Sequence, residues 1–505
     1  MIYSFNPFGY EGSLVNVEVD LRRGIPAVDI VGISDGAVAE ERERVRSAIK
    51  NSNLEFPTER VLISVSPADL RKEGTGFDLS VAIGVLEAQY GLEVKDDVFV
   101  MGELELSGNV RNVKAVQAGL STAIASGILY AIIPHSDNLQ VPEGMKVKTV
   151  SNLTEAYFAL CDLAQEHYET FTEYPTEKVG NEIEFDDLYE GETPLDEAFV
   201  KYGDEKDNLD GLKFALVVAA SGKHNLITWG KPGCGKTMSL QKFPQILPKL
   251  TENELPSVKR IYSIAGMPKK DRRRPFRMPH QTASIEGICG GGVTCRPGEI
   301  SLAHNGVLFL DEATEFRSSV LQMLRVPLEN RNITLSRAGR STCYPADFQL
   351  IMSLNPCPCG NYGSEDRICL CSAKAIQTYW NKLSAPLIDR LAIRYDCNNP
   401  IKAELLTLEE MRAKVKKAWE VQLARQGKLN DRLSPDEMLE YCKLTEDANK
   451  LFTRECEMRY LSPRSISNVL KVARTVADMN GIETIDTDCV KTALSLRAST
   501  PLENM

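Results

Sequence analysis

The chain has 505 residues, of which 43% are hydrophobic and 26% are charged, the composition of an ordinary globular protein. Its length suggests about three domains. It has no apolar run long enough to cross a bilayer and no secretory signal at its start, so we expect a cytoplasmic protein without membrane contact. A net charge of −11 argues against a surface coated with nucleic-acid-binding cations, although it leaves room for a local basic channel.

Residues 1–165 are predicted to form a compact α/β domain. Apolar and polar residues alternate over 15–21, which is the period of a half-buried strand. The segment 37–49 has the spacing of a helix, and short apolar runs at 61–65 and 128–133 indicate further strands. Strands and helices that alternate in this way favour an α/β fold for the N-terminal part of the chain.

The next segment, 166–199, is predicted to be an acidic linker. Over 171–197 it is rich in carboxylates and poor in residues that could form a core, so we expect it to be solvated. A peptide that regulates a partner is the alternative. Over 200–398, apolar strands precede Gly-rich loops, as in a parallel α/β core, whereas helical spacing dominates 399–505 and predicts an α-helical domain.

A phosphate-binding loop follows the predicted strand Asn225–Trp229. Its sequence fits the pattern G-x-x-x-x-G-K-T between a strand and a helix, and a Gly-rich surface turn is the alternative. The glycines let backbone N–H groups converge on phosphate oxygens at the start of the helix. We expect Lys236 to reach the β- and γ-phosphates and Thr237 to bind Mg²⁺. The predicted nucleotide-binding residues are Gly230, Lys231, Pro232, Gly233, Cys234, Gly235, Lys236 and Thr237.

Two acids follow the apolar run 306–310. Asp311 is predicted to hold Mg²⁺, directly or through water, and Glu312 to orient and polarise the attacking water that phosphoryl transfer needs. An apolar strand that ends in acids is usually structural when it stands alone. With the phosphate-binding loop upstream, the pair indicates a site that binds and hydrolyses a nucleoside triphosphate with Mg²⁺.

Three longer stretches of the chain resemble the magnesium-chelatase-like AAA+ ATPases, and among these the ComM/YifB family. They are Pro275–His280, Arg296–Gly306 and Asn355–Gly360, and further matches lie at 23–26, 44–49, 66–78 and 472–478. The resemblance covers nearly the whole chain. It implies a Lon-protease-like (S5-type) N-terminal α/β domain, a P-loop AAA+ α/β core with inserted β-hairpins, and a C-terminal α-helical lid of the magnesium chelatase type.

The resemblance also implies ATP and Mg²⁺ as cofactors and roles for three more residues at the nucleotide. Asn355, at the end of the predicted strand 348–355, would be sensor 1, which helps to position the lytic water. Arg390 resembles the arginine finger, which stabilises transition-state charge in the site of the adjacent subunit. Arg464 resembles sensor 2, which couples the helical lid to the γ-phosphate. The alternatives are a plain strand-end Asn, an arginine paired with Asp389, and a surface arginine at a helix start.

The likeness to Lon comes with losses at both catalytic positions. Aligning 72–78 and 108–117 with the Lon motifs places Gly76 where the nucleophilic Ser stands and Gln117 where the Lys base stands. A glycine cannot attack a carbonyl and a glutamine cannot act as a general base, so we expect a non-proteolytic module. In addition, 202–212 does not reproduce the family's adenine-binding segment, which leaves adenine selectivity open.

The family resemblance implies a hexameric ring that moves branched or single-stranded DNA through a central pore, as in branch migration or helicase activity during recombination or natural transformation. The segment 332–343 fits a family-specific hairpin with its turn at 338–339, which would place Arg337 and Arg340 at the tip to grip phosphates. An ATPase that remodels proteins or inserts metal, with no DNA substrate, is the alternative.

Two other segments have weaker signals. A second insert is expected over 283–298, with Gly290–Gly292 as its turn. The basic stretch 269–274 is more typical of a solvated loop than of a DNA contact.

The chain has 13 cysteines, which are expected to be reduced thiols in a protein without a secretory signal. Two C-x-C pairs, Cys357 with Cys359 and Cys369 with Cys371, are predicted to wrap one Zn²⁺ as four thiolates. The usual zinc knuckle has C-x-x-C spacing, so four reduced thiols on a loop are the alternative.

Overall fold

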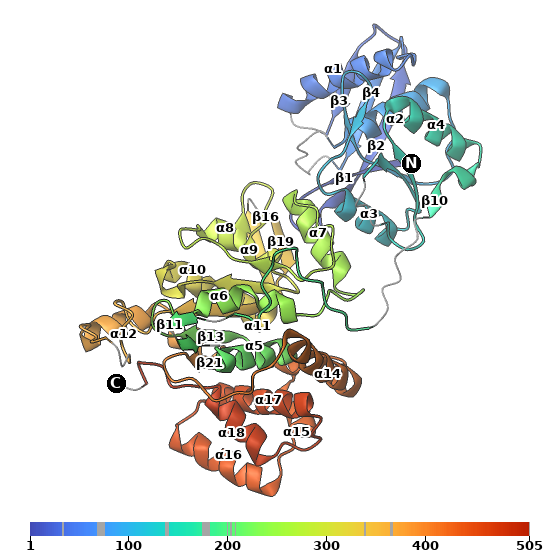
Figure 1. Ribbon diagram of the computed structural model, residues 1–505. Coiled ribbons are helices and arrows are strands. Elements are labelled where there is room, and N and C mark those ends of the chain that lie inside the picture. The colour runs from blue at the N-terminus through green and yellow to red at the C-terminus, as the bar shows by residue number, and fades with distance from the viewer. Residues whose placement is uncertain are drawn as a thin grey trace.

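The computed structural model describes the whole chain apart from short segments. The residues outside the description are 33–34, 68–75, 137–140, 174–181, 199, 203–204, 208, 338–339, 364–366 and 504–505. Figure 1 shows an elongated molecule with the N-terminal elements at one end, a second sheet in the middle and a group of helices at the C-terminal end. Within the described residues, no helix is long and apolar enough to span a membrane.

The N-terminal part is built on an eight-stranded sheet in the order β10-β9-β8-β5-β1-β2-β4-β3. Its strands are β1 (Ile2–Asn6), β2 (Ser13–Arg22), β3 (Val28–Val31), β4 (Arg60–Ser66), β5 (Val98–Val100), β8 (Tyr130–Pro134), β9 (Lys146–Val150) and β10 (Thr172–Glu173). Its helices are α1 (Asp35–Asn51), α2 (Asp78–Tyr90), α3 (Val116–Ala125) and α4 (Leu153–Ala164), and β6 (Glu103–Leu104) pairs with β7 (Val110–Arg111). The strands and the helix predicted here are confirmed.

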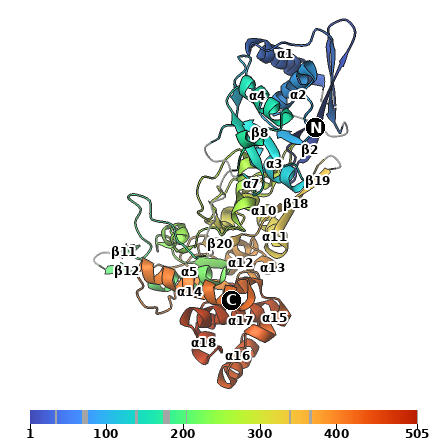
Figure 2. The same cartoon turned by 90° about the vertical axis from the view of Figure 1, so that its right-hand side faces the viewer.

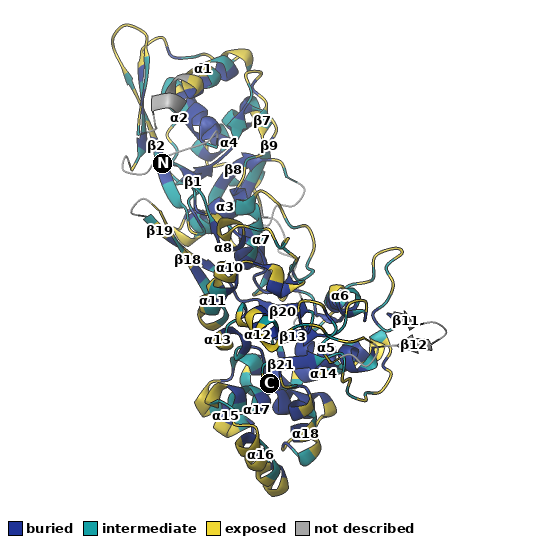
Figure 3. Cartoon of the chain, turned by 90° about the vertical axis from the view of Figure 1, so that its left-hand side faces the viewer, coloured by how far each residue is buried: buried dark blue, intermediate teal, exposed yellow. Residues whose placement is uncertain are grey.

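A five-stranded parallel sheet forms the middle of the molecule, in the order β14-β17-β20-β13-β21. Its strands are β13 (Leu226–Trp229), β14 (Phe276–Arg277), β17 (Val307–Leu310), β20 (Gln349–Leu354) and β21 (Ile393–Asp396). Every residue of β13, β17 and β20 is buried, as expected for parallel strands that are covered on both faces (Figure 3). The predicted parallel α/β core is confirmed.

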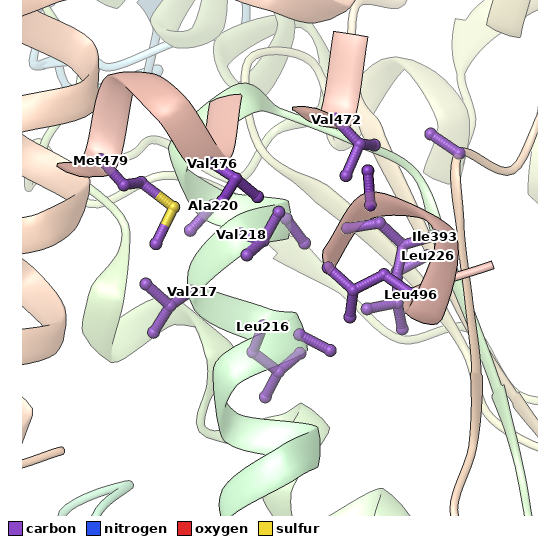
Figure 4. Packing of buried hydrophobic residues seen from close by; sticks show 14 of the residues in the cluster. Leu216, Val217, Val218, Ala220, Leu226, Ile393, Val472, Val476, Met479 and Leu496 are labelled. Carbon is purple, nitrogen blue, oxygen red and sulfur yellow. The ribbon is translucent and has the colours of Figure 1, made fainter. Parts of the chain in front are cut away.

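Helices at the C-terminal end pack against this sheet layer and share its core. They are α14 (Leu408–Gln426), α15 (Pro435–Tyr441), α16 (Glu446–Met458), α17 (Pro463–Asn480) and α18 (Thr487–Ser495). Figure 4 shows Val476 and Met479 of α17 above Val217 and Ala220 of α5 (Asp210–Gly222). The Trp419 indole of α14 also donates a hydrogen bond to the Ala220 carbonyl at 3.0 Å. The helical C-terminus is confirmed, and its helices form one hydrophobic cluster with the sheet.

The remaining elements surround the central sheet. They are the helices α6 (Lys236–Gln241), α7 (Leu255–Ala265), α8 (Ile285–Cys289), α9 (Glu299–Leu302), α10 (Ser318–Met323), α11 (Arg325–Asn330), α12 (Ala373–Asn381) and α13 (Ala385–Ile388), and the paired strands β11 (Val200–Tyr202) with β12 (Glu205–Asp207), β15 (Gly290–Gly291) with β16 (Arg296–Pro297) and β18 (Asn332–Arg337) with β19 (Arg340–Pro345). Short 3₁₀ turns lie at Tyr168–Thr170, Phe243–Ile246, Ala313–Glu315 and Asn430–Arg432. In the segment 283–298, Gly290 and Gly291 lie in β15 and Gly292 begins the turn to β16, so the predicted turn is confirmed for Gly292 and wrong for the other two glycines.

The acidic segment is solvated only in part where the structure describes it, because its carboxylates are mostly exposed whereas a few apolar residues are anchored. Leu195 is fully buried, and Ile183 and Phe185 pack against the hydrophobic core of the central sheet. These few apolar residues anchor the segment, and ion pairs hold two of its carboxylates. Asp186 lies 3.6 Å from Arg273, and Glu184 lies 3.4 Å from the cations of Lys249 and Arg272.

The basic stretch 269–274 supplies most of the cations for these ion pairs. The Arg273 guanidinium also lies 3.6 Å above the Tyr189 ring, and Arg274 forms an ion pair at 2.8 Å with Glu254. This stretch is therefore neither a solvated loop nor a free cationic surface, because its arginines are engaged by the acidic segment and by nearby carboxylates.

Candidate functional site

Three loops with predicted site residues meet at one edge of the parallel sheet. The phosphate-binding loop follows β13, the two acids follow β17, and Asn355 follows β20, which lies between those strands. Trp229 pairs with Leu354, and Leu310 pairs with Met352, so the three strands end within two residues of one another. Ligands of open parallel sheets bind outside this carboxyl edge.

The phosphate-binding loop curls around the ammonium group of Lys236. The lysine Nζ donates hydrogen bonds to the carbonyl oxygens of Gly230 at 2.7 Å and Lys231 at 3.0 Å, and the side chain is buried. Gly233 and Gly235 have φ values of 81° and 82°, a left-handed conformation that side chains disfavour. The turn therefore needs glycine at these positions.

A hydrogen-bonded chain links the loop to the two acids. The Thr237 hydroxyl donates to the Asp311 carboxylate at 2.9 Å, and the Ser353 hydroxyl donates to the same oxygen. Ser353 also accepts the backbone N–H of Glu312 at 3.2 Å. A hydroxyl and a carboxylate in contact fit the oxygen ligands that Mg²⁺ prefers. Ser353 is one residue that the sequence alone did not reveal.

Gln281 is a second residue that sequence reasoning missed. Its side-chain amide donates a hydrogen bond of 2.6 Å to the carboxylate of Glu312, which itself has a left-handed backbone with φ of 50°. Gln281 comes shortly after β14, the strand next to β17, so the sheet order brings the two side chains together. No local pattern marks this glutamine, because its partner lies 31 residues further along the chain.

The thiol of Cys234 lies inside the phosphate-binding loop and close to Cys397. A hydrogen bond with the Cys397 thiol lowers the pKa of Cys234, and the charge of Lys236 acts in the same direction, whereas burial opposes both effects. The same contact and burial raise the pKa of Cys397. The loop therefore carries one acidified thiol beside the lysine ammonium.

Arg390 and Arg464 lie together at the opposite edge of the sheet. Arg390 precedes β21, and its carbonyl accepts a hydrogen bond of 3.4 Å from Asn225, which precedes β13. Its guanidinium forms an ion pair with Glu329 at 2.6 Å, and Arg464 pairs with the same carboxylate oxygen. These side chains line a cavity of about 500 Å³ that none of the phosphate-loop residues lines.

Arg390 and Arg464 therefore share Glu329 as their counter-ion. Neither arginine lies at the sheet edge that carries Lys236. The pairing of Arg390 with Asp389, considered as an alternative, does not appear among the described ion pairs, in which Asp389 contacts Arg394 at 3.4 Å. The negative charge that holds both arginines belongs to Glu329, near the end of α11. The hydrogen bond from Arg390, together with that from Arg464 and the charges of both arginines, holds the pKa of the Glu329 carboxyl below its usual range, although burial acts in the opposite direction.

The arginines predicted at the hairpin tip have different surroundings. Strands β18 and β19 pair in antiparallel fashion up to Arg337 and Arg340, and the turn at 338–339 lies outside the described residues. Arg337 is half exposed and lies 4.0 Å from the Glu286 carboxylate. The Arg340 guanidinium lies 3.7 Å from the centre of the Phe8 ring. Figure 2 shows this strand pair reaching toward the N-terminal sheet.

The four cysteines predicted to hold zinc converge directly after the candidate sensor, Asn355. Their Sγ atoms all lie within 4.8 Å of one another. The two positions aligned with the Lon dyad lie in the N-terminal part, where Gly76 lines a cavity of about 490 Å³ and Gln117 lines a neighbouring one.

Comparisons with known proteins agree with this architecture. Residues 207–405 match the family described as magnesium chelatase, subunit ChlI, residues 17–137 match subunit ChlI of Mg-chelatase, and residues 407–497 match the ChlI C-terminal family. The competence protein ComM of Haemophilus influenzae is 35% identical over 521 residues, which cover 99% of this chain and 97% of that protein.

Two further relatives are informative. YifB of Escherichia coli is 36% identical over 512 residues, with 99% of this chain and 97% of that protein covered. The DNA repair protein RadA of Mycobacterium tuberculosis is 31% identical over 127 residues, which cover 25% of this chain and 26% of RadA. With similarity to ComM and YifB along almost its whole length, this chain belongs to the ComM/YifB family of magnesium-chelatase-like AAA+ proteins.

Proposed function

We propose that this protein is an ATP-hydrolysing AAA+ motor that assembles into a ring and moves DNA in recombination. The ring has six subunits, as the family resemblance implies. The convergence of Lys236, Thr237, Asp311 and Glu312 at one sheet edge carries the proposal. Buried lysine, hydroxyl and carboxylate groups at this edge match the needs of a nucleoside triphosphate and its metal.

Each side chain at this edge has a defined task in the proposal. Lys236 binds the β- and γ-phosphates once nucleotide replaces its contacts with the loop carbonyls. Thr237 and Asp311 hold Mg²⁺, which neutralises phosphate charge when bound. The Glu312 carboxylate first releases its hydrogen bond with Gln281 and then accepts a proton from the attacking water. Asn355 helps to position that water.

The separated arginines support assembly into a ring. Arg390 and Arg464 lie at the sheet edge opposite the phosphate-binding loop, so neither serves the nucleotide of its own subunit. In a head-to-tail ring, that edge of one protomer meets the nucleotide of the next, and both cations stabilise transition-state charge there. Arg464 thus acts alongside Arg390 in this proposal, although the sequence resemblance implied a role within its own lid.

DNA as the substrate is supported by the relatives and by the hairpin arginines. ComM is named a competence protein and RadA a DNA repair protein. Arg337 remains half exposed at the far end of β18, where it can contact a phosphate backbone in a pore. The alternative, an ATPase that remodels proteins or inserts metal without a DNA substrate, is less favoured because ComM, which aligns with almost the whole chain, is named for competence. The N-terminal domain acts as a Lon-like, non-proteolytic contact module.

Branch migration on a synthetic four-way DNA junction tests this proposal. Wild-type protein should move the junction only with ATP and Mg²⁺, and Glu312→Gln should bind ATP without moving DNA, since it lacks the proton acceptor. Arg454→Ala, which removes an exposed arginine on α16 far from both edges, is the matched control and should behave as wild type. ATP hydrolysis without movement of any DNA structure would transfer support to protein remodelling.

A further inference from the structure

The geometry of the four-cysteine cluster matches that of a single bound metal ion. The Sγ atom of Cys369 lies 3.7 Å from those of both Cys357 and Cys359, which are 3.3 Å apart. Zinc with four thiolates has Zn–S bonds of about 2.3 Å, so a regular tetrahedron places its sulfurs about 3.8 Å apart. Two of the three distances agree within about 0.1 Å, and all three are far longer than a disulfide bond.

Cys357 is buried in the hydrophobic cluster of the central sheet, and Tyr362 packs against it, so burial anchors the start of the loop. Burial alone does not explain the second cysteine pair, because Ile368 and Leu370, the two aliphatic neighbours of Cys369, are 83% and 89% exposed. The neighbouring Cys369 and Cys371 are more buried than either. A second pair that turns small thiols inward and large aliphatic groups outward is positioned by its sulfurs more than by apolar burial.

Backbone hydrogen bonds hold the first cysteine pair in a tight turn. The Gly360 N–H donates to the Cys357 carbonyl at 2.9 Å and closes a tight turn, and the Tyr362 N–H donates to the Cys357 sulfur at 3.4 Å. Hydrogen bonds of this kind orient metal ligands and stabilise a thiolate.

We propose that Cys357, Cys359, Cys369 and Cys371 bind one Zn²⁺ in a closed structural site, and that the zinc loop, the described residues 357–363 and 367–371, supports the phosphate-binding loop from outside. Four thiolates satisfy tetrahedral zinc and leave no open position for a substrate or water. The ion therefore takes no chemical part in ATP hydrolysis and acts through the shape of the loop that it closes.

Two contacts connect the zinc loop to the phosphate-binding loop. Gly360 has φ of +79°, and a Cβ atom there would lie 2.6 Å from Pro232 ring carbons, so the backbone of one loop rests on the ring of the other. Asn398 bridges the same two loops, because it accepts the Lys231 N–H at 3.0 Å and donates to the Tyr362 carbonyl at 3.4 Å. Loss of the metal therefore removes a support of the nucleotide site.

The metal site stands independently of the proposed function, whereas its effect on nucleotide affinity rests on that function. The full-length protein, purified under reducing conditions, should contain about one zinc per chain by elemental mass spectrometry. Cys369→Ser with Cys371→Ser removes two ligands and leaves the residues of the Gly360–Pro232 and Asn398 contacts in the sequence. It should lose zinc and bind a fluorescent ATP analogue about tenfold more weakly, because small displacements of positioning groups are costly.

Two single variants test the metal site and the contact between Gly360 and Pro232 separately. Cys343→Ser removes an exposed cysteine on β19 outside the cluster, and it should keep both zinc and nucleotide affinity. Gly360→Ala retains all four thiols but presses on Pro232, so it should keep zinc and still bind the analogue more weakly.

The outcomes distinguish the two parts of the inference. Less than about one-third of a zinc per wild-type chain, or equal zinc in the double cysteine variant, overturns the metal site. Loss of zinc with unchanged nucleotide affinity overturns the support of the phosphate-binding loop. Zinc without nucleotide binding in the wild type refutes the proposed function and this supporting role together, and it leaves the metal site established. The zinc content of the wild type decides the metal site even if the double variant does not fold.

Discussion

The position of Arg390 predicts that two inactive variants will restore each other's activity when they share a ring. Leu226 of β13 pairs with Ile393 of β21, and the phosphate-binding loop begins beyond Trp229, whereas Arg390 precedes Ile393. At about 3.3 Å per residue, the four-residue strand β13 alone separates the two ends by roughly 13 Å. An arginine held by Glu329 at the far edge cannot span the sheet to its own Lys236.

The expected recovery follows from counting interfaces. Lys236→Ala removes the phosphate-binding lysine, and Arg390→Ala removes the cation offered to the neighbour. In rings assembled at random from equal amounts of both variants, about half of the interfaces have an intact lysine, and about half of those face an intact arginine. About one quarter of the sites are then complete, so ATP hydrolysis should recover to about one quarter of the wild-type rate if the sites act independently.

Phosphate release from mixtures of the two variants, refolded or co-expressed together, measures this recovery. The rate should peak at equal amounts and fall on either side. The matched control pairs Lys236→Ala with a chain that carries both substitutions; none of its sites has an intact lysine, so its rate should remain at background. A mixture of the two single variants that hydrolyses no more ATP than the separate proteins would show that Arg390 does not act across the interface.

Three other predictions follow from the geometry. Gln281→Ala frees the Glu312 carboxylate from a hydrogen bond of 2.6 Å. Because such a bond to a charged group contributes about 1.5 kcal/mol, the basal ATPase rate should rise by up to about tenfold. An unchanged or lower steady-state rate would contradict this role of Gln281. Arg337→Ala with Arg340→Ala should keep the basal rate but lose its stimulation by DNA, and full stimulation would exclude the hairpin from DNA contact. Burial raises the pKa of Asp78 to about 8, above the 3.8 of an unperturbed Asp, so the folded state keeps a proton that the unfolded chain loses and stability falls as pH rises through this interval. Thermal melting from pH 5 to 8.5 should therefore decline less steeply for Asp78→Asn than for wild type, and parallel curves would count against the raised pKa.

Features written in consecutive residues were predictable from the sequence, because their geometry is local. The phosphate-binding loop requires a strand, two glycines with positive φ and a helix, and all of these lie within 225–241. The acids after β17 could be assigned for the same reason, since an apolar run followed by two carboxylates fixes both the strand and its end. The contacts of Ser353 and Gln281 depend instead on which strands are neighbours, and no local pattern encodes the sheet order.

The acidic segment shows how a composition argument fails in part. The carboxylates around Asp186 and the arginines of 269–274 each looked solvated, because each stretch was judged without its partner. In the structure they neutralise one another across more than 80 residues of sequence, as in the ion pair between Asp186 and Arg273. Hydropathy alone could not reveal this tertiary contact, because the two opposite charges lie far apart in the chain.

Contacts between the N-terminal part and β19 constrain how the hairpin can move. The Tyr10 N–H donates to the Thr342 hydroxyl at 2.9 Å, and the Phe8 ring covers the Arg340 guanidinium. Arg260 of α7 donates to the Tyr10 carbonyl at 2.8 Å, which ties the same segment to the ATPase core. A hairpin that shifts during hydrolysis must either break the contacts of Phe8 and Tyr10 or carry the N-terminal sheet with it. The N-terminal domain is therefore mechanically connected to the hairpin, and in the proposed motor a module without a protease dyad can still influence how the substrate is engaged.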